Sequence, residues 1–104
     1  MAWFLLIIAG LLEIVWAFSM KQSDGFTKLG ATSLTLVAMI FSFGLLSWSM
    51  KSLPLGTAYM VWTGIGAVGA FVVGVIFLQE PLSTMRILAA LLIVGGLILM
   101  KVSS

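Results

Sequence analysis

Four long apolar runs, separated by short polar segments, constrain the fold of this 104-residue chain more than any other feature. The runs cover residues 2–20, 29–50, 57–78 and 85–102. Each has about the 20 residues that an α-helix needs to cross a hydrocarbon core of about 30 Å. Transmembrane β-strands would be about ten residues long and alternate in polarity, which these runs do not. The pattern predicts an all-α membrane protein, with residues 1–104 forming a single domain of four transmembrane helices.

The composition agrees with a chain that lipid surrounds. Hydrophobic residues make up 62% of it and charged residues 8%, whereas a soluble domain carries about 25% charged residues. The chain has no Cys and no His, which removes disulfides, thiolate metal sites and the commonest general base. It also has no cluster of basic residues. We therefore expect no metal, no other cofactor, no nucleic-acid partner and no enzymatic activity.

The positive charges are divided almost evenly between the two ends of the predicted helices. Lys21, Lys28 and Arg86 belong to one membrane face, and Lys51, Lys101 and the amino terminus belong to the other. An excess of Lys and Arg in the cytoplasmic loops normally orients a membrane protein. Either that rule is weak in so short a chain, or the chain inserts in both orientations. Two oppositely oriented copies would supply the inverted repeats that transporters use, so we expect an antiparallel homodimer.

One carboxyl group, that of Glu13, lies deep inside a predicted helix. Glu13 follows the start of the first run by eleven residues, which places it roughly 16 Å deep, about the centre of the bilayer. An ionisable group there costs several kcal/mol unless it faces a cavity or a partner. Residues spaced by three and four form one helix face around it: Leu6, Ala9, Gly10, Glu13, Trp16, Ala17 and Met20. These small and aromatic neighbours predict a pocket, although a neutral acid hydrogen-bonded between helices is the alternative.

A lone carboxyl group in such a pocket suits the exchange of a cation for a proton. The group holds a proton or a cation but not both at once, which is the simplest basis for proton-coupled antiport. A guanidinium-like cation fits best, because its planar set of N–H groups matches a carboxylate at two points. Aromatic faces in the pocket would add cation–π attraction.

The third run supplies aromatic faces and close helix contacts. Tyr59 and Trp62 lie on one stripe of the predicted helix with Gly66. We expect Trp62 to line the pocket, whereas Tyr59, near the helix start, is either a pocket residue or an interfacial aromatic. Gly66, Ala70 and Gly74 have the spacing that lets two helices approach closely.

The sequence resembles the small multidrug resistance family, and within it the guanidinium-exporter branch. The matching segments are AGLLEIVWA at residues 9–17, KQSDGFTK at 21–28, KSLPLGTAY at 51–59 and VWTGIGAVG at 61–69. Trp16 is typical of the guanidinium branch, because the branch that exports polyaromatic cations has a small residue there.

The resemblance implies an antiparallel, dual-topology homodimer in the bacterial inner membrane. It implies export of guanidinium in exchange for protons by alternating access, with the Glu13 residues of both subunits binding substrate and proton. The other site residues that it implies are Gly10, Trp16, Ser42, Tyr59 and Trp62. Ser42 and Trp62 would orient the glutamates through hydrogen bonds, and Gly10 would leave room for the site.

Three other functions stay open on the sequence. A polyspecific exporter would carry bulky hydrophobic organic cations, although Trp16 narrows the predicted pocket. A membrane adaptor that transports nothing would use Glu13 only to pair helices. A passive cation channel would conduct without coupling to protons.

Overall fold

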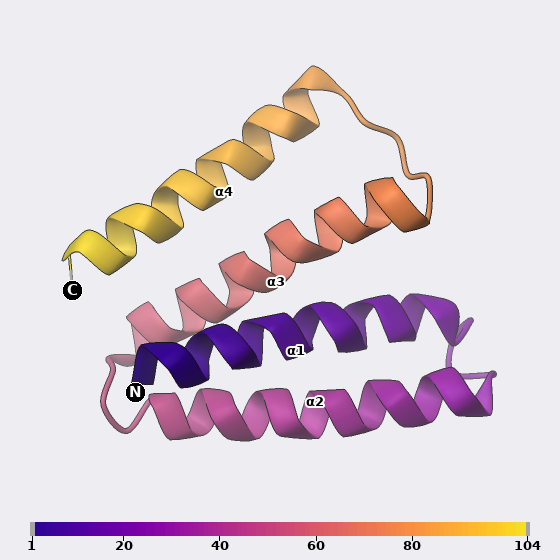
Figure 1. The fold of residues 1–104 in the computed structure, drawn as a ribbon, viewed down its shortest axis with the longest axis horizontal. Helices are drawn as coiled ribbons and strands as arrows, with labels where there is room; N and C mark the ends of the chain where they lie inside the picture. The colour runs from indigo at the N-terminus through magenta and orange to yellow at the C-terminus, as the bar shows by residue number, and fades with distance from the viewer. Residues whose placement is uncertain (1, 104) are drawn as a thin grey trace.

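A computed structural model describes residues 2–103, which form four α-helices joined by short loops (Figure 1). The helices are α1 (Ala2–Gln22), α2 (Leu29–Ser49), α3 (Leu55–Phe77) and α4 (Thr84–Ser103). All four are long and apolar enough to cross a membrane. The prediction of an all-α chain with four such helices is therefore confirmed. Met1 and Ser104, which the predicted domain includes, lie outside the described residues.

The start of α3 differs from the sequence-based expectation. The third apolar run predicts a helix that starts at residue 57, yet α3 begins at Leu55 and includes Gly56 in its first turn. The carbonyl of Pro54 accepts the first helical bond, from the Ala58 N–H at 3.0 Å. A proline directly before a helix removes no helical hydrogen bond, because the N–H groups of the first turn have no partner within the helix.

A tight turn joins α1 to α2. Asp24, Gly25 and Phe26 adopt left-handed φ angles of 51°, 72° and 68°. The buried Ser23 hydroxyl donates to the carbonyl of Met20 at 2.6 Å and accepts the Phe26 N–H at 3.0 Å. These bonds compensate the strained backbone and reverse the chain within a few residues, so that α2 runs back along α1.

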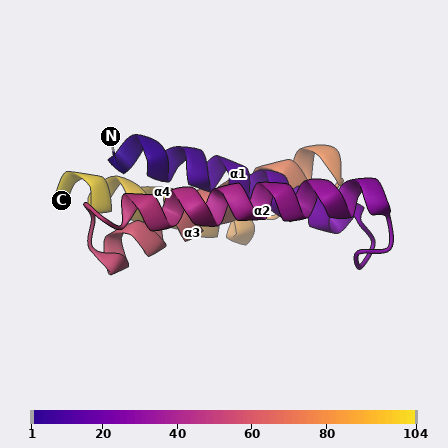
Figure 2. The same ribbon diagram turned by 90° about the horizontal axis from the view of Figure 1, so that it is seen from below.

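The four helices lie side by side in one layer, in the order α2, α1, α3, α4 (Figures 1 and 2). The backbone of α1 lies against α2 and α3, whereas that of α4 approaches α3 alone. The backbone extends 40 × 34 × 16 Å along its principal axes, so the layer is much thinner than it is wide. A chain this flat has almost no interior of its own.

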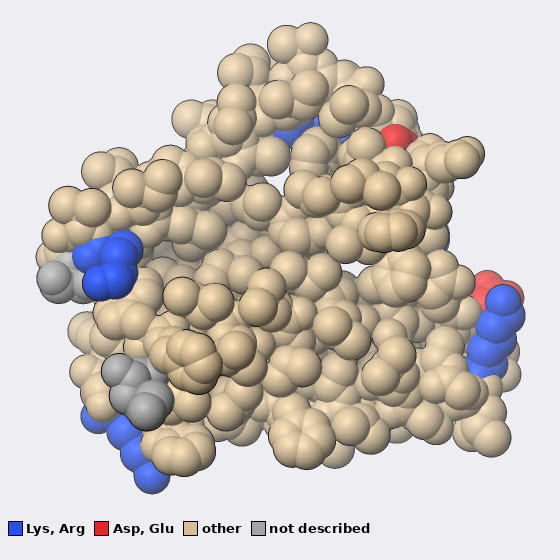
Figure 3. Space-filling view, in the orientation of Figure 1, with Lys and Arg blue, Asp and Glu red and all other residues tan. Residues whose placement is uncertain are grey.

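The small core lies where α1, α2 and α3 meet. Its buried hydrophobic members are Leu6, Ala9, Leu46, Ala58, Val61 and Trp62. No residue of α4 is buried, and most of its apolar side chains are exposed. The charged side chains visible in Figure 3 lie toward the rim of the layer, around a broad middle without charged side chains. The uncharged middle fits a layer that contacts lipid or another apolar surface.

Candidate functional site

The Glu13 carboxyl group lies against the backbone of α3. Its contact is Gly66, which is buried, and a Cβ atom at that position would collide with Glu13 Oε1. Glu13 Oε1 is itself buried, and no hydrogen-bond donor within residues 2–103 reaches it. Nor do three Asp, Glu, His or Cys side chains gather anywhere in these residues to hold a metal ion. The site therefore contains a buried acceptor that the described chain leaves unsatisfied, which suits a proton or a small cation.

Trp16 follows Glu13 by one helical turn and also has an unsatisfied group. Its indole Nε1–H is buried and finds no acceptor among the described residues. The ring packs edge-on against Phe43 of α2, with centroids 6.2 Å apart at an angle of 73°. A carboxylate acceptor and an indole donor thus lie one turn apart on α1 without meeting each other.

Ser42 and Trp62 form a buried chain of hydrogen bonds that joins three helices. The Ser42 hydroxyl, fully buried on α2, donates to the carbonyl of Ala9 on α1 at 2.7 Å. It also accepts the Nε1–H of Trp62 on α3 at 3.0 Å. The two side chains therefore bond to each other and to backbone within this chain, and neither bonds to Glu13. This arrangement fixes the Trp62 ring beside the site.

Phe43 is a site neighbour that the sequence analysis missed. It lies 6.2 Å from Trp16 and 5.6 Å from Trp62, and Tyr59 lies 5.8 Å from Trp62, all between ring centroids. These four rings form what we call the aromatic row. The only signal in the sequence was the position of Phe43 directly after Ser42, and neighbours in a helix normally point about 100° apart.

Gly10 allows α1 and α3 to approach each other one turn before Glu13. A Cβ atom at Gly10 would lie 2.7 Å from Cγ2 and 2.8 Å from Cβ of Ile65. Gly69 likewise receives the side chain of Ile14. Because β-branched Ile65 cannot easily move aside, the small residue at position 10 controls how closely the Glu13 turn approaches α3.

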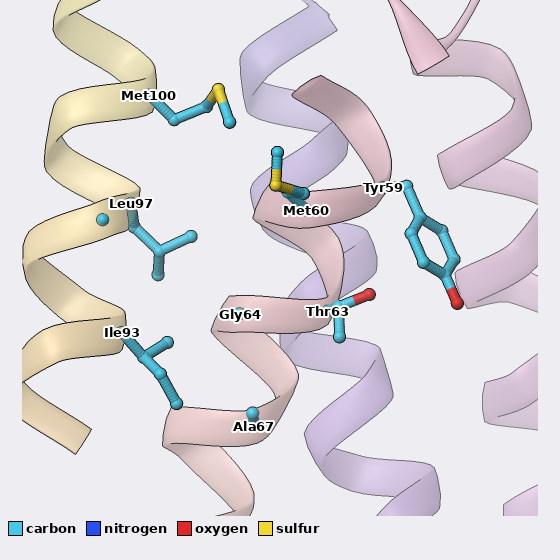
Figure 4. Close-up of a pocket in the computed structure, with 9 residues that line it drawn as sticks. Tyr59, Met60, Thr63, Gly64, Ala67, Ile93, Leu97 and Met100 are labelled. Atoms are coloured by element: carbon cyan, nitrogen blue, oxygen red, sulfur yellow. The ribbon is translucent and has the colours of Figure 1, made fainter. Parts of the chain in front are cut away.

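A groove with a volume of about 450 Å³ separates α3 from α4. Ile93, Leu97 and Met100 extend into it from α4 (Figure 4). Tyr59 borders the groove, but its ring lies on the side of α3 that faces away from α4. The side chain of Tyr59 is 53% exposed, so it extends the aromatic row toward the surface. Glu13 does not line this groove, because it faces the opposite side of α3.

Comparisons with known proteins agree with this arrangement. The sequence model of the Small Multidrug Resistance protein family matches residues 1–93. The chain is 53% identical to the guanidinium exporters of Citrobacter freundii and Escherichia coli strain K12, and 52% identical to that of Salmonella typhi. Each match covers 100% of this chain and 99% of the relative. These relatives are named as exporters rather than enzymes, and the four helices make the chain a multi-pass membrane protein. The chain belongs to the small multidrug resistance family.

Proposed function

We propose that the protein exports guanidinium and small guanidinyl cations from the bacterial cell, across the inner membrane, in exchange for protons. The observation that carries this proposal is the buried, unsatisfied Oε1 of Glu13 against Gly66. The names of the curated relatives support guanidinium as the cation. Planar N–H groups can bind both oxygens of the carboxylate, and the aromatic row supplies π faces beside it.

Exchange follows from the cost of burying an uncompensated charge. A bare carboxylate in the middle of a membrane is several kcal/mol less favourable than one that is neutralised. The site therefore changes its access from one side to the other only when a proton or a cation occupies Glu13. Because the two occupants compete for one group, export of a cation is followed by entry of a proton. Glu13 binds both, and alternating access connects the two steps.

The working unit in this proposal is an antiparallel homodimer. A layer 16 Å thick cannot enclose a pathway by itself, and α4 buries none of its residues within one chain. The indole N–H of Trp16 also needs an oxygen acceptor that the described residues do not supply. A second, inverted copy would close the pathway and place two Glu13 carboxyl groups in one site, where their titrations are coupled. The hydrogen bonds from Ser42 and Trp62 to the glutamates stay a prediction for this dimer.

Transport in reconstituted liposomes tests the proposal. A guanidinium gradient is imposed, and internal pH and current are recorded for the wild type and for Glu13→Gln. We expect proton movement opposite to guanidinium in the wild type and none in the variant. Asp24→Asn is the matched control, because it removes one carboxylate from an exposed loop residue and should leave exchange intact.

Each alternative function predicts a different result. Guanidinium flux without proton movement would identify a channel, and no flux in the wild type would leave an adaptor. Transport of a bulky quaternary ammonium dye as well as guanidinium would identify a polyspecific exporter.

A further inference from the structure

A second carboxyl group lies against α3 in the same manner as that of Glu13. The chain turns back after α3, where the N–H groups of Leu78 and Glu80 both donate to the carbonyl of Gly74 at 3.1 Å. Gln79 takes a left-handed φ of 55° to make this turn. As a result the Glu80 side chain folds over Gly74, and a Cβ atom at Gly74 would collide with Glu80 Oε1. A glutamate on an exposed loop would be expected to extend into water, but this one returns to the helix.

The two carboxyl groups contact one face of α3, that of Glu13 at Gly66 and that of Glu80 at Gly74. Gly66 and Gly74 are eight residues apart on α3, which is about 12 Å along the helix axis. A cavity of about 160 Å³ lies at the Glu80 end, lined by Ala17 and Lys21 of α1 and by Ala70 and Gly74 of α3, among others. Positions 13, 17 and 21 share one face of α1, and positions 66, 70 and 74 share one face of α3. The cavity therefore continues the Glu13 contact toward the membrane face where loops α1–α2 and α3–α4 lie.

The charges around this cavity favour a mobile cation. Glu80 lies just beyond the carbonyl end of α3, where the helix dipole is negative and adds to the charge of the carboxylate. Lys21 lines the same cavity, yet no ion pair within 4.0 Å joins it to Glu80 in the described structure. A lysine on a flexible stem that stays unpaired beside a carboxylate can give way to another cation.

We propose that Glu80 forms an outer site at which a guanidinium-type cation binds on its way to or from Glu13, with Lys21 as its competitor. This inference rests on the proposed function. A carboxylate in a small and otherwise mostly apolar cavity suits a planar monovalent cation, whereas Ca²⁺ would require six or more oxygen ligands. In an inverted dimer, the two copies would present the outer site on both membrane faces.

Guanidinium self-exchange across liposomes at constant pH tests the outer site, with isotope-labelled guanidinium as the probe. We expect Glu80→Gln to raise the half-saturating concentration about threefold to fivefold and to leave the maximum rate nearly unchanged. Lys21→Gln should lower that concentration, because a competing cation is lost. The double variant should behave like Glu80→Gln alone, since Lys21 acts through Glu80.

Two matched variants distinguish cation binding at Glu80 from a nonspecific effect of surface charge and from a loss of folded protein. Asp24→Asn removes a carboxylate from the same membrane face but outside the cavity, so the half-saturating concentration should stay at the wild-type value. Glu80→Asp keeps the charge and should restore most of the wild-type affinity, even if Glu80→Gln lowers the yield of folded protein.

Several results would overturn the inference. One is a half-saturating concentration that Glu80→Gln leaves unchanged, and another is an equal rise in Asp24→Asn. A rise in Lys21→Gln, or a Glu80→Asp variant that behaves like Glu80→Gln, would assign both residues a structural role. If the wild type shows no Glu13-dependent exchange, the proposed function fails and this inference with it. Normal Glu13-dependent exchange with unaltered Glu80→Gln kinetics would reject the outer site alone.

Discussion

Helices α1 to α3 and helix α4 are similarly long and apolar, yet they are held in different ways. The first three meet through close contacts at glycine and through the Ser42 hydrogen bonds. By comparison, α4 contacts α3 at one glycine, Gly64, against which Leu97 fits. A cation near each of its ends also lies over an aromatic ring, Arg86 at 5.8 Å from the Phe71 centroid and Lys101 at 4.9 Å from that of Trp3.

This difference separates two requirements of a membrane transporter. A binding site needs fixed geometry, and the glycine contacts and hydrogen bonds supply it in α1 to α3. A helix such as α4, which has no buried residue within its own chain, leaves most of its apolar surface available for lipid or for a second copy. Substitutions in the two regions should therefore differ in kind: those in α1 to α3 should change the site, and those in α4 should change association.

The largest effect is expected at Gly66. In Gly66→Ala the new methyl group would collide with the Glu13 carboxyl group, so guanidinium exchange in liposomes should be almost abolished. Overpacking of this kind should also cost about 1–3 kcal/mol of stability. Gly44→Ala on α2 is the matched control, because a Cβ atom there meets no atom within 4 Å. Equal activity of the two variants would contradict the Glu13–Gly66 contact.

A smaller loss is expected when the hydrogen bonds between α1, α2 and α3 are removed. Ser42→Ala leaves the buried Trp62 N–H without its acceptor, which should lower the free energy of unfolding by about 1–3 kcal/mol. Reversible unfolding in mixed micelles measures this change. Ser47→Ala, at an exposed position on the same helix, should have little effect. An equal decrease in the free energy of unfolding in both variants would mean that the Ser42 hydrogen bonds do not stabilise the fold.

In α4, a substitution should act on the dimer rather than on the single chain. A Cβ atom at Gly95 meets no atom within 4 Å in the described structure, so Gly95→Leu should leave the helices of one chain intact. We expect the proposed dimer to dissociate about tenfold more readily, which corresponds to about 1.4 kcal/mol. Counting photobleaching steps of labelled protein in lipid measures the dimer fraction. An unchanged fraction would place Gly95 outside the interface.

The smallest effect is expected at the start of α4. Cation–π contacts at exposed sites contribute about 0.5–1 kcal/mol. A double-mutant cycle with Arg86→Gln and Phe71→Leu should therefore give a coupling energy of that size in unfolding experiments. No coupling would show that Arg86 merely lies near the ring and does not hold the start of α4.

The sequence predicted the four helices because the thickness of the bilayer sets their length, and the depth of Glu13 in the bilayer stays a prediction. Spacing along a helix determines direction around that helix, and in the structure Gly10 and Glu13 of α1 both contact α3. Spacing cannot tell which face of one helix meets which face of another. For that reason the sequence did not reveal that Ser42 bonds to Trp62 and Ala9, or that Phe43 joins the aromatic row.

Two further features depended on backbone detail that no pattern of residue types carries. The return of Glu80 to Gly74 requires the left-handed turn at Gln79, a residue type that does not favour that conformation. The sequence also did not reveal that α4 buries no residue, because α4 is as apolar as α1 to α3. The even distribution of Lys and Arg predicts that the protein inserts in both orientations. The structure of one chain does not test this prediction.

The flatness of the helix layer has a consequence for genetics. In the proposed homodimer each chain contributes one wall of the pathway, so a single codon change alters both walls at once. A substitution in the site is then present twice in one pathway, so its effect on transport is larger than that of the same change in one subunit alone. A cell that expresses a wild-type and a variant gene together would form mixed dimers with one wall altered. Coexpression of wild-type protein with Glu13→Gln would therefore reveal whether one intact glutamate is enough, and an inactive mixed dimer would make the variant dominant over the wild type.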